Sequence, residues 1–215
     1  MSLTPPPDAA VFDFDGVIID SRKAVALAVN GTLVDHGFAA RSPGELDRFI
    51  GPTVTNAFAE LTGEAPDSAP VAAAIATYHA RYADVYLHAT HLVDGICDVL
   101  AGLSLPLAIA TTKPVDFVGP LLDALAIERY FRVVCAPPMS ALEEPKAITI
   151  ARALQALGAR DAVMVGDRSF DVEGAHANGM RAIGVTWGIG DRAELELAGA
   201  DAIVARPSAL LDLLR

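Results

Sequence analysis

Residues 9–16 read Ala-Ala-Val-Phe-Asp-Phe-Asp-Gly, a short apolar run that ends in two aspartates and a glycine. Four apolar residues followed by turn-forming residues are typical of a buried strand. If the chain is still extended after Phe12, the side chains of Asp13 and Asp15 fall on the same side. An Asp-x-Asp pair after a strand is also common in solvated loops. This pair alone therefore does not distinguish a surface loop from a binding site.

Five more apolar runs look like strands, and helical periodicity follows most of them. They are Leu105–Ala110, Arg132–Ala136, Ala162–Val165, Ala182–Val185 and Ala202–Val204. Strand–helix alternation predicts a parallel sheet with helices on both faces. The runs show no polar alternation, as expected for strands covered on both sides. We therefore predict an α/β fold, a doubly wound, Rossmann-like and mostly parallel sheet.

The alternation is interrupted between residues 21 and 90, where only helical patterns occur. One apolar stripe has helical spacing: Val71, Ile75, Tyr78, Tyr82 and Val85. This pattern predicts a small all-helical domain inserted after the first strand. The expected organisation is an α/β core domain over 1–20 and 91–215 and a helical domain over 21–90.

The composition limits the classes of partner. The chain has 215 residues, is 53% hydrophobic and carries a net charge of −11. Such acidity argues against a nucleic-acid polymer or an anionic membrane surface as partner. No apolar run approaches the roughly 20 residues of a membrane helix. Cys97 and Cys135 lie far apart and are expected to be buried, reduced thiols, which fits a cytoplasmic protein.

Polar residues follow four of the predicted strands, where ligands bind in parallel α/β sheets. Beyond Asp13 and Asp15, the polar positions are Thr111-Thr112-Lys113, Lys146 at a helix start, and Gly166-Asp167 with Asp171. Polar clusters that share one edge of a sheet are stronger evidence for a binding site than any one of these motifs alone.

Four carboxylates would converge at this edge: Asp13, Asp15, Asp167 and Asp171. Carboxylates this close repel one another and would protonate unless a cation intervenes. Oxygen-only ligands favour a hard ion, for which Mg²⁺ fits best. Thr111 and Lys146 add a hydroxyl and a positive charge, both suited to phosphate oxygens. These are the components of phosphoryl transfer.

Within this set, Asp13 is the natural nucleophile, because carboxylates form aspartyl-phosphate intermediates. Asp15 could protonate the leaving oxygen and then deprotonate the attacking water. Gly16 would allow close backbone approach and the bend into the helical insertion.

These residues resemble the haloacid dehalogenase superfamily of phosphotransferases over nearly the whole chain. Asp13–Ser21 looks like the first motif of that family, Thr111 the second, Lys146 the third, and Gly166-Asp167 with Asp171 the fourth. The helical insertion matches the family's cap domain. Residues Val165–Gly190 are similar to the phosphoglycolate phosphatase branch, and Phe49–Pro52 to a loop of bacterial 5′-nucleotidase-like members.

The resemblance implies a role for each matched residue. Asp13 would be the nucleophile, Asp15 the general acid/base, and Thr111 and Lys146 the residues that hold the phosphoryl group. Mg²⁺ would be bound by the Asp13 side chain, the Asp15 carbonyl and Asp167, with Asp171 close behind. Six further residues are candidates for substrate contact: Phe14, Gly16, Thr112, Lys113, Arg48 and Gly51.

The expected function is an Mg²⁺-dependent phosphatase that hydrolyses phosphate monoesters of small metabolites, as phosphoglycolate phosphatases or 5′-nucleotidases do. Two alternatives stay open, a sugar phosphomutase of the same superfamily and a phospho-acceptor protein without turnover. The expected partner is a small phosphorylated metabolite, and the expected state is a monomer or homodimer.

Overall fold

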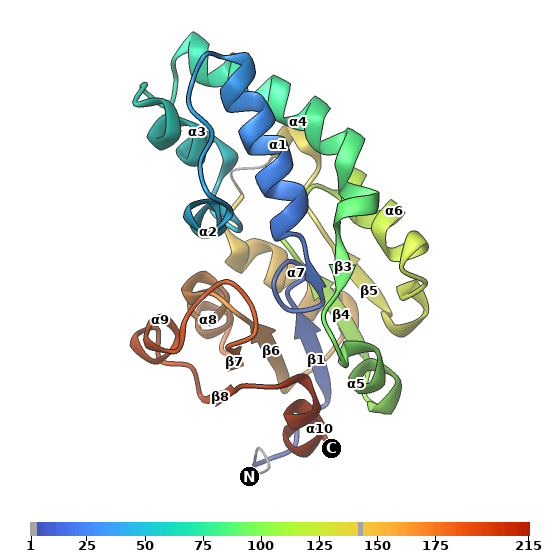
Figure 1. The fold of residues 1–215 in the computed structure, drawn as a ribbon. Coiled ribbons are helices and arrows are strands. Elements are labelled where there is room, and N and C mark those ends of the chain that lie inside the picture. The colour runs from blue at the N-terminus through green and yellow to red at the C-terminus, as the bar shows by residue number, and fades with distance from the viewer. Residues whose placement is uncertain (1–3, 142–143) are drawn as a thin grey trace. The chain divides into compact units, whose positions relative to one another are not determined.

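The structure is a computed structural model that describes residues 4–141 and 144–215. The chain forms two compact units (Figure 1). One comprises the residues up to Asp20 together with Leu92–Arg215, and the other comprises Ser21–His91.

The first unit is built on a six-stranded sheet of order β5-β4-β1-β6-β7-β8, in which every neighbouring pair is parallel. Its strands are β1 (Ala9–Phe12), β4 (Leu107–Ala110), β5 (Val133–Cys135), β6 (Ala162–Gly166), β7 (Arg181–Val185) and β8 (Ala202–Val204). All six correspond to the predicted runs, and the predicted α/β fold class is confirmed.

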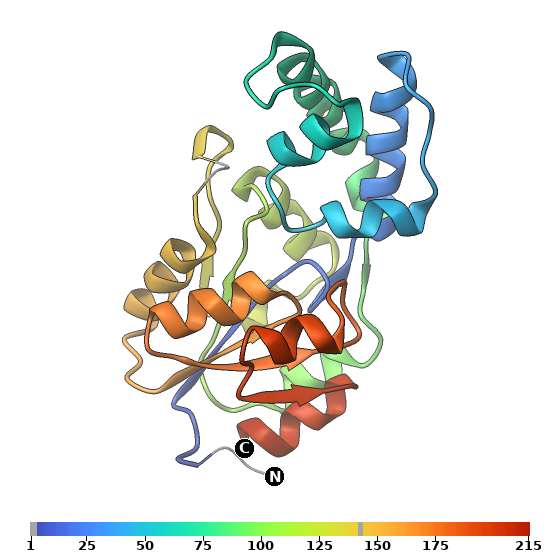
Figure 2. The ribbon, with the colours of Figure 1, turned by 90° about the vertical axis from the view of Figure 1, so that its left-hand side faces the viewer.

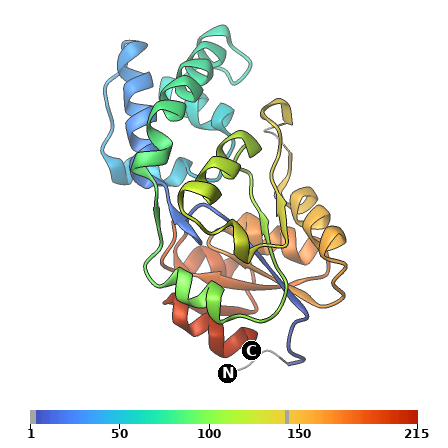
Figure 3. The same cartoon turned by 90° about the vertical axis from the view of Figure 1, so that its right-hand side faces the viewer.

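Helices cover both faces of this sheet. Figure 2 shows α7 (Lys146–Leu157), α8 (Ser169–Ala177) and α9 (Arg192–Leu197) on one face. Figure 3 shows α5 (Ile96–Gly102), α6 (Val115–Ala124) and α10 (Leu210–Leu214) on the other. Short 3₁₀ helices complete the unit: η2 (Glu128–Tyr130), η3 (Met139–Ala141) and η4 (Pro207–Ala209).

The central strands are buried on both sides, which explains their unbroken apolar sequence. Ala9 and Val11 of β1 pack in a cluster with Ile150 of α7 and Val172 of α8. Phe12 points to the opposite face and is also fully buried. Burial of this apolar surface holds the carboxyl ends of the strands in place.

Two short strands, β2 (Ile19–Asp20) and β3 (His91–Leu92), form a separate two-stranded sheet that the sequence patterns did not predict. A tight turn precedes β2. In it, the Ile18 and Ile19 N–H groups donate to the Phe14 carbonyl, and the Gly16 N–H donates to the Ile19 carbonyl. Gly16 has φ +81°, a conformation that favours glycine.

Apart from His91 of β3, all the regular secondary structure of the second unit is helical. They are α1 (Arg22–Asp35), α2 (Pro43–Leu46), η1 (Asp47–Phe49), α3 (Val54–Thr62) and α4 (Ala69–Ala89). Helix α4 packs along α1 and α3. The rings of Tyr78, Tyr82 and Tyr86 stack in sequence along α4 at 5.7 Å centroid spacing.

No helix among the described residues has both the length and the apolar character needed to span a membrane.

Cys97 and Cys135 are free thiols, as predicted, although both are half-buried rather than buried.

Candidate active site

The site begins where β1 ends. Asp13 directly follows Phe12, and its N–H donates to the Val165 carbonyl of β6 at 2.9 Å. Strand β1 lies between β4 and β6, and the connections that leave these strands run to opposite sides of the sheet. The carboxyl end of β1 is therefore the place where ligands bind in sheets of this kind. The Asp13 side chain is buried, and its Oδ1 accepts a hydrogen bond from the Phe14 N–H at 2.6 Å.

Two more carboxylates follow β6, Asp167 in the turn after this strand and Asp171 in the first turn of α8. Asp167 and Asp171 are fully buried, and each offers an oxygen within 4.8 Å of an oxygen of Asp13 and of the other. Asp171 Oδ2 accepts from the N–H groups of Asp167 and Arg168, both at 3.1 Å, and so caps the start of α8. The structure thus brings together three of the four predicted carboxylates.

Lys146, the first residue of α7, enters this cluster. Its Nζ lies 2.6 Å from Asp13 Oδ1 and 2.9 Å from Asp171 Oδ1. Burial opposes the lysine charge, but the two carboxylates hold the pKa of Lys146 above its ordinary value. Burial raises the pKa of Asp13 to about 7 although Lys146 opposes the shift, and the neighbouring Asp171 adds to it.

The charge of this cluster does not balance, because three buried carboxylates face one ammonium group. Burial, followed by the charges of Asp171 and Asp13, raises the pKa of Asp167 well above its ordinary value. Among the described residues, Asp167 Oδ1 has no hydrogen-bond partner. A buried oxygen without a donor, in an all-carboxylate cluster, fits a hard divalent cation.

Asp15 makes a different contact. Both of its carboxylate oxygens lie close to Lys113 Nζ, at 3.0 and 3.1 Å. The Lys113 side chain is itself buried, and its backbone N–H donates to Thr111 Oγ1 at 3.1 Å. Lys113, which the sequence suggested as a substrate contact, therefore lies against the candidate acid/base.

The remaining predicted residues of the first unit line the same strand ends. Thr111 follows β4, is buried, and donates its N–H to the Cys135 carbonyl at 3.0 Å. Thr112 beside it is half-buried. The Phe14 side chain is fully buried, which leaves only its backbone for a ligand. A Cβ on Gly16 would lie 2.2 Å from Asp167 Oδ2, so the backbone at this position lies directly against that carboxylate.

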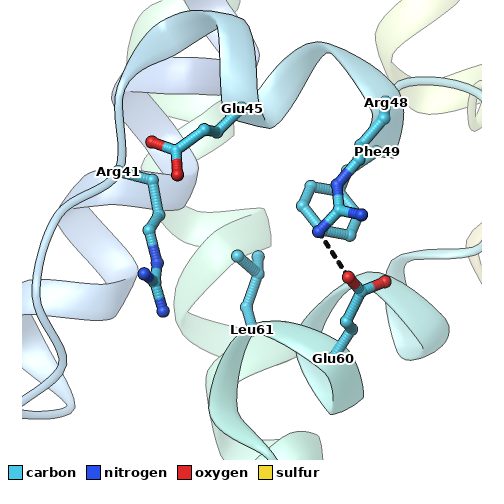
Figure 4. A pocket seen from close by; sticks show the side chains of 6 residues that line it. All are labelled: Arg41, Glu45, Arg48, Phe49, Glu60 and Leu61. Atoms are coloured by element: carbon cyan, nitrogen blue, oxygen red, sulfur yellow. Dashed lines mark hydrogen bonds and ion pairs between the residues drawn. The ribbon is translucent and has the colours of Figure 1, made fainter.

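Arg48 and Gly51 belong to the helical unit. Arg48 forms an ion pair with Glu60 and lies over the ring of Phe49, 4.6 Å from its centroid (Figure 4). It lines a pocket of about 370 Å³ together with Arg41, Glu45, Phe49, Glu60 and Leu61. Gly51, just beyond η1, has φ +102°.

One contact to the cluster was not predicted. The N–H of Ile189 donates to Asp167 Oδ2 at 2.6 Å. A backbone donor carries no side-chain signal, so only the flanking glycines, Gly188 and Gly190, hint that this loop approaches another group closely.

The sequence and the fold match known proteins. Residues 10–185 match the family model of the haloacid dehalogenase-like hydrolases. A 5′-nucleotidase from Pseudomonas aeruginosa is 30% identical over 86% of this chain and 85% of its own length. A phosphoglycolate phosphatase from Pectobacterium atrosepticum is 28% identical over 94% of this chain and 90% of its own length.

Solved structures agree with this assignment. A haloacid dehalogenase-like family hydrolase from Streptococcus pneumoniae superposes with a TM-score of 0.88 at 28% identity, covering 97% of this chain and 98% of the other. The chain is therefore a hydrolase of the haloacid dehalogenase-like family, similar to its phosphoglycolate phosphatases and 5′-nucleotidases.

Proposed function

We propose that this hydrolase is an Mg²⁺-dependent phosphatase of small phosphorylated metabolites that works through an aspartyl-phosphate on Asp13. The observation that carries the proposal is the buried contact between Asp13 and Lys146 beside two further carboxylates. Its relatives include a phosphoglycolate phosphatase and a 5′-nucleotidase, both named for phosphate monoesters.

Asp13 is the nucleophile of this scheme. Its carboxylate oxygen forms a bond to phosphorus while the bond from phosphorus to the ester oxygen breaks. Lys146, whose Nζ lies 2.6 Å from Asp13 Oδ1, favours the ionised form of the nucleophile and offers positive charge to the phosphoryl oxygens. The Thr111 hydroxyl, at the neighbouring strand end, donates to the same group.

Asp15 moves the protons. As a carboxylic acid it protonates the departing ester oxygen, and as a carboxylate it then takes a proton from the water that attacks phosphorus. The second attack breaks the bond between phosphorus and Asp13 and restores the free carboxylate. Lys113 holds the Asp15 carboxylate through both oxygens and so limits where it can reach.

The metal ligands of this scheme are the carboxylates of Asp13 and Asp167 and the Asp15 carbonyl, with Asp171 next to them. When bound, Mg²⁺ supplies positive charge that offsets the carboxylates and the phosphoryl oxygens. The orphaned Oδ1 of Asp167 supports this assignment.

The helical unit, Ser21–His91, is the candidate cap that selects the leaving group. Its insertion directly after the segment that carries Asp13 and Asp15 supports this role. Arg48 and Gly51 remain its candidate substrate contacts.

The test is phosphate release from a panel of phosphoglycolate, nucleoside 5′-monophosphates and sugar phosphates, with Mg²⁺ and with a chelator. We expect release that needs Mg²⁺ and is lost in Asp13→Asn. Asp123→Asn, on the exposed surface of α6, is the matched control. Full activity of Asp13→Asn would reject the proposal. Isomerisation without phosphate release, or a stable phosphoprotein without turnover, would replace it with one of the two alternatives.

A further inference from the structure

The loop after β7 folds back over Asp167, and we call residues Trp187–Gly190 the Trp187 loop. Besides the hydrogen bond from Ile189 N–H to Asp167 Oδ2, two glycines bring its backbone against this residue. A Cβ on Gly188 would lie 2.2 Å from Asp167 Oδ2, and one on Gly190 would lie 2.0 Å from the Asp167 carbonyl oxygen. The Trp187 loop therefore fits Asp167 only because it has no side chain at these two positions.

A second backbone segment, in the turn after β1, lies against the same carboxylate. A Cβ on Gly16 would also lie 2.2 Å from Asp167 Oδ2. Asp167 Oδ2 is thus confined by Gly16 and Gly188 and takes its hydrogen bond from Ile189. Oδ1 is left as the oxygen without a hydrogen-bond partner in the described part of the chain.

One side chain connects the two segments. The half-buried indole of Trp187 donates its Nε1–H to the Val17 carbonyl at 3.2 Å. Val17 is fully buried and directly follows Gly16 in the turn that carries Asp13 and Asp15. The Trp187–Val17 hydrogen bond therefore links the two backbone segments that lie against Asp167.

We propose that Trp187 is a positioning residue for cation binding. Through Val17 it holds Gly16 and Gly188 at the separation that fixes the Asp167 carboxylate beside Asp13 and Asp171. This inference rests on the cation site of the proposed function, and it assigns to Trp187 a role in metal affinity rather than in chemistry. Loss of the indole N–H should loosen a ligand without removing one, and outer contacts of this kind change metal affinity by about tenfold or more.

The test measures Mg²⁺ binding directly, by titration calorimetry on the full chain without substrate. Trp187→Phe keeps an aromatic ring but has no N–H, and we expect its Mg²⁺ affinity to fall by about tenfold. Gly188→Ala, which places a Cβ on Asp167 Oδ2, should weaken Mg²⁺ binding further. Thr186→Val is the matched control, since the Thr186 hydroxyl bonds instead to the Val204 carbonyl at 3.5 Å. Its affinity should equal that of the wild type.

A second readout needs no variant, because Trp187 is the single tryptophan of the chain. Its fluorescence should change on Mg²⁺ addition with the midpoint found by calorimetry. Unchanged affinity in a folded Trp187→Phe protein, or no fluorescence change while Mg²⁺ binds, would overturn the positioning role and leave the proposed phosphatase intact. A wild-type chain that binds no Mg²⁺ would instead reject the metal site of the proposed function.

Discussion

The ammonium nitrogen of Lys146 lies 2.6 Å from Oδ1 of Asp13, and both side chains are almost completely buried. The same nitrogen lies 2.9 Å from Asp171 Oδ1, so a single lysine is shared by two carboxylates. The cluster thus has an internal cation before any metal binds, but only one positive charge for three negative ones.

Lys146→Met should therefore affect both stability and turnover. Removing one partner of a buried ion pair leaves uncompensated charge, which costs about 3–5 kcal/mol in the free energy of unfolding. Phosphate release should fall by roughly 100-fold or more, because a preorganised charge at the reacting group is lost. Urea unfolding and steady-state kinetics measure the two effects. Lys23→Met, at the exposed start of α1, should change neither. Wild-type turnover by a folded Lys146→Met enzyme would contradict the role of this lysine.

Lys113 offers a way to separate positioning from substrate binding. Its Nζ contacts both oxygens of Asp15, so Lys113→Met should leave the candidate acid/base poorly oriented. We expect kcat to fall by about ten- to a hundredfold, part of the contribution of a general acid/base. KM should change little, as measured with the best substrate of the panel. A raised KM with unchanged kcat would instead show that Lys113 contacts the substrate, as the sequence suggested.

The convergence of Asp13, Asp167, Asp171 and Lys146 could be predicted because parallel strands end at one edge of the sheet, where apolar runs are readily recognised. The Lys113–Asp15 contact could not, since it depends on the side-chain conformations of residues that are distant in sequence. Strands β2 and β3 have two residues each, too few for a periodic pattern. The Ile189 donor is a backbone N–H, which cannot be recognised from the identity of the residue.

The carboxylate cluster predicts opposite effects of Asp167→Asn with and without metal. In chelator at neutral pH, the variant should unfold at a higher temperature than the wild type, because it lacks a buried carboxyl group whose ionisation is opposed by burial and by Asp171 and Asp13. With Mg²⁺ at about 100 times its Kd, the wild type should gain about 2.7 kcal/mol and the variant much less. Thermal unfolding in both conditions measures the crossover. Equal stabilisation of the two proteins by Mg²⁺ would show that Asp167 is not a ligand.

Gly166, the last residue of β6, tests how closely the backbone approaches the cluster. A Cβ there would lie 2.2 Å from Asp171 Cβ and 2.5 Å from its Cγ. Gly166→Ala should therefore destabilise the fold by about 1–3 kcal/mol, as other overpacking changes do. Gly44→Ala is the control, because Gly44 lies in α2 with open space around its Cβ position. That change should stabilise by about 0.5–1 kcal/mol. Denaturant unfolding distinguishes the two, and a neutral Gly166→Ala would contradict the tight approach.

His79 predicts how stability depends on pH in the helical unit. It lies half-buried in α4 with its ring 5.5 Å from that of Tyr78, and burial lowers the pKa of His79 below its ordinary 6.5. The unfolded chain therefore binds a proton more readily than the folded chain as pH falls through 6.5. The contribution of His79 to the free energy of unfolding should therefore decrease below this pH. His79→Gln should reduce that decrease, whereas His88→Gln, exposed on the same helix, serves as the control. Urea unfolding at pH 7.5 and 5.5 measures the difference, and a histidine NMR titration reports the site directly. An identical pH dependence in His79→Gln and the wild type would show that His79 protonation is not linked to folding.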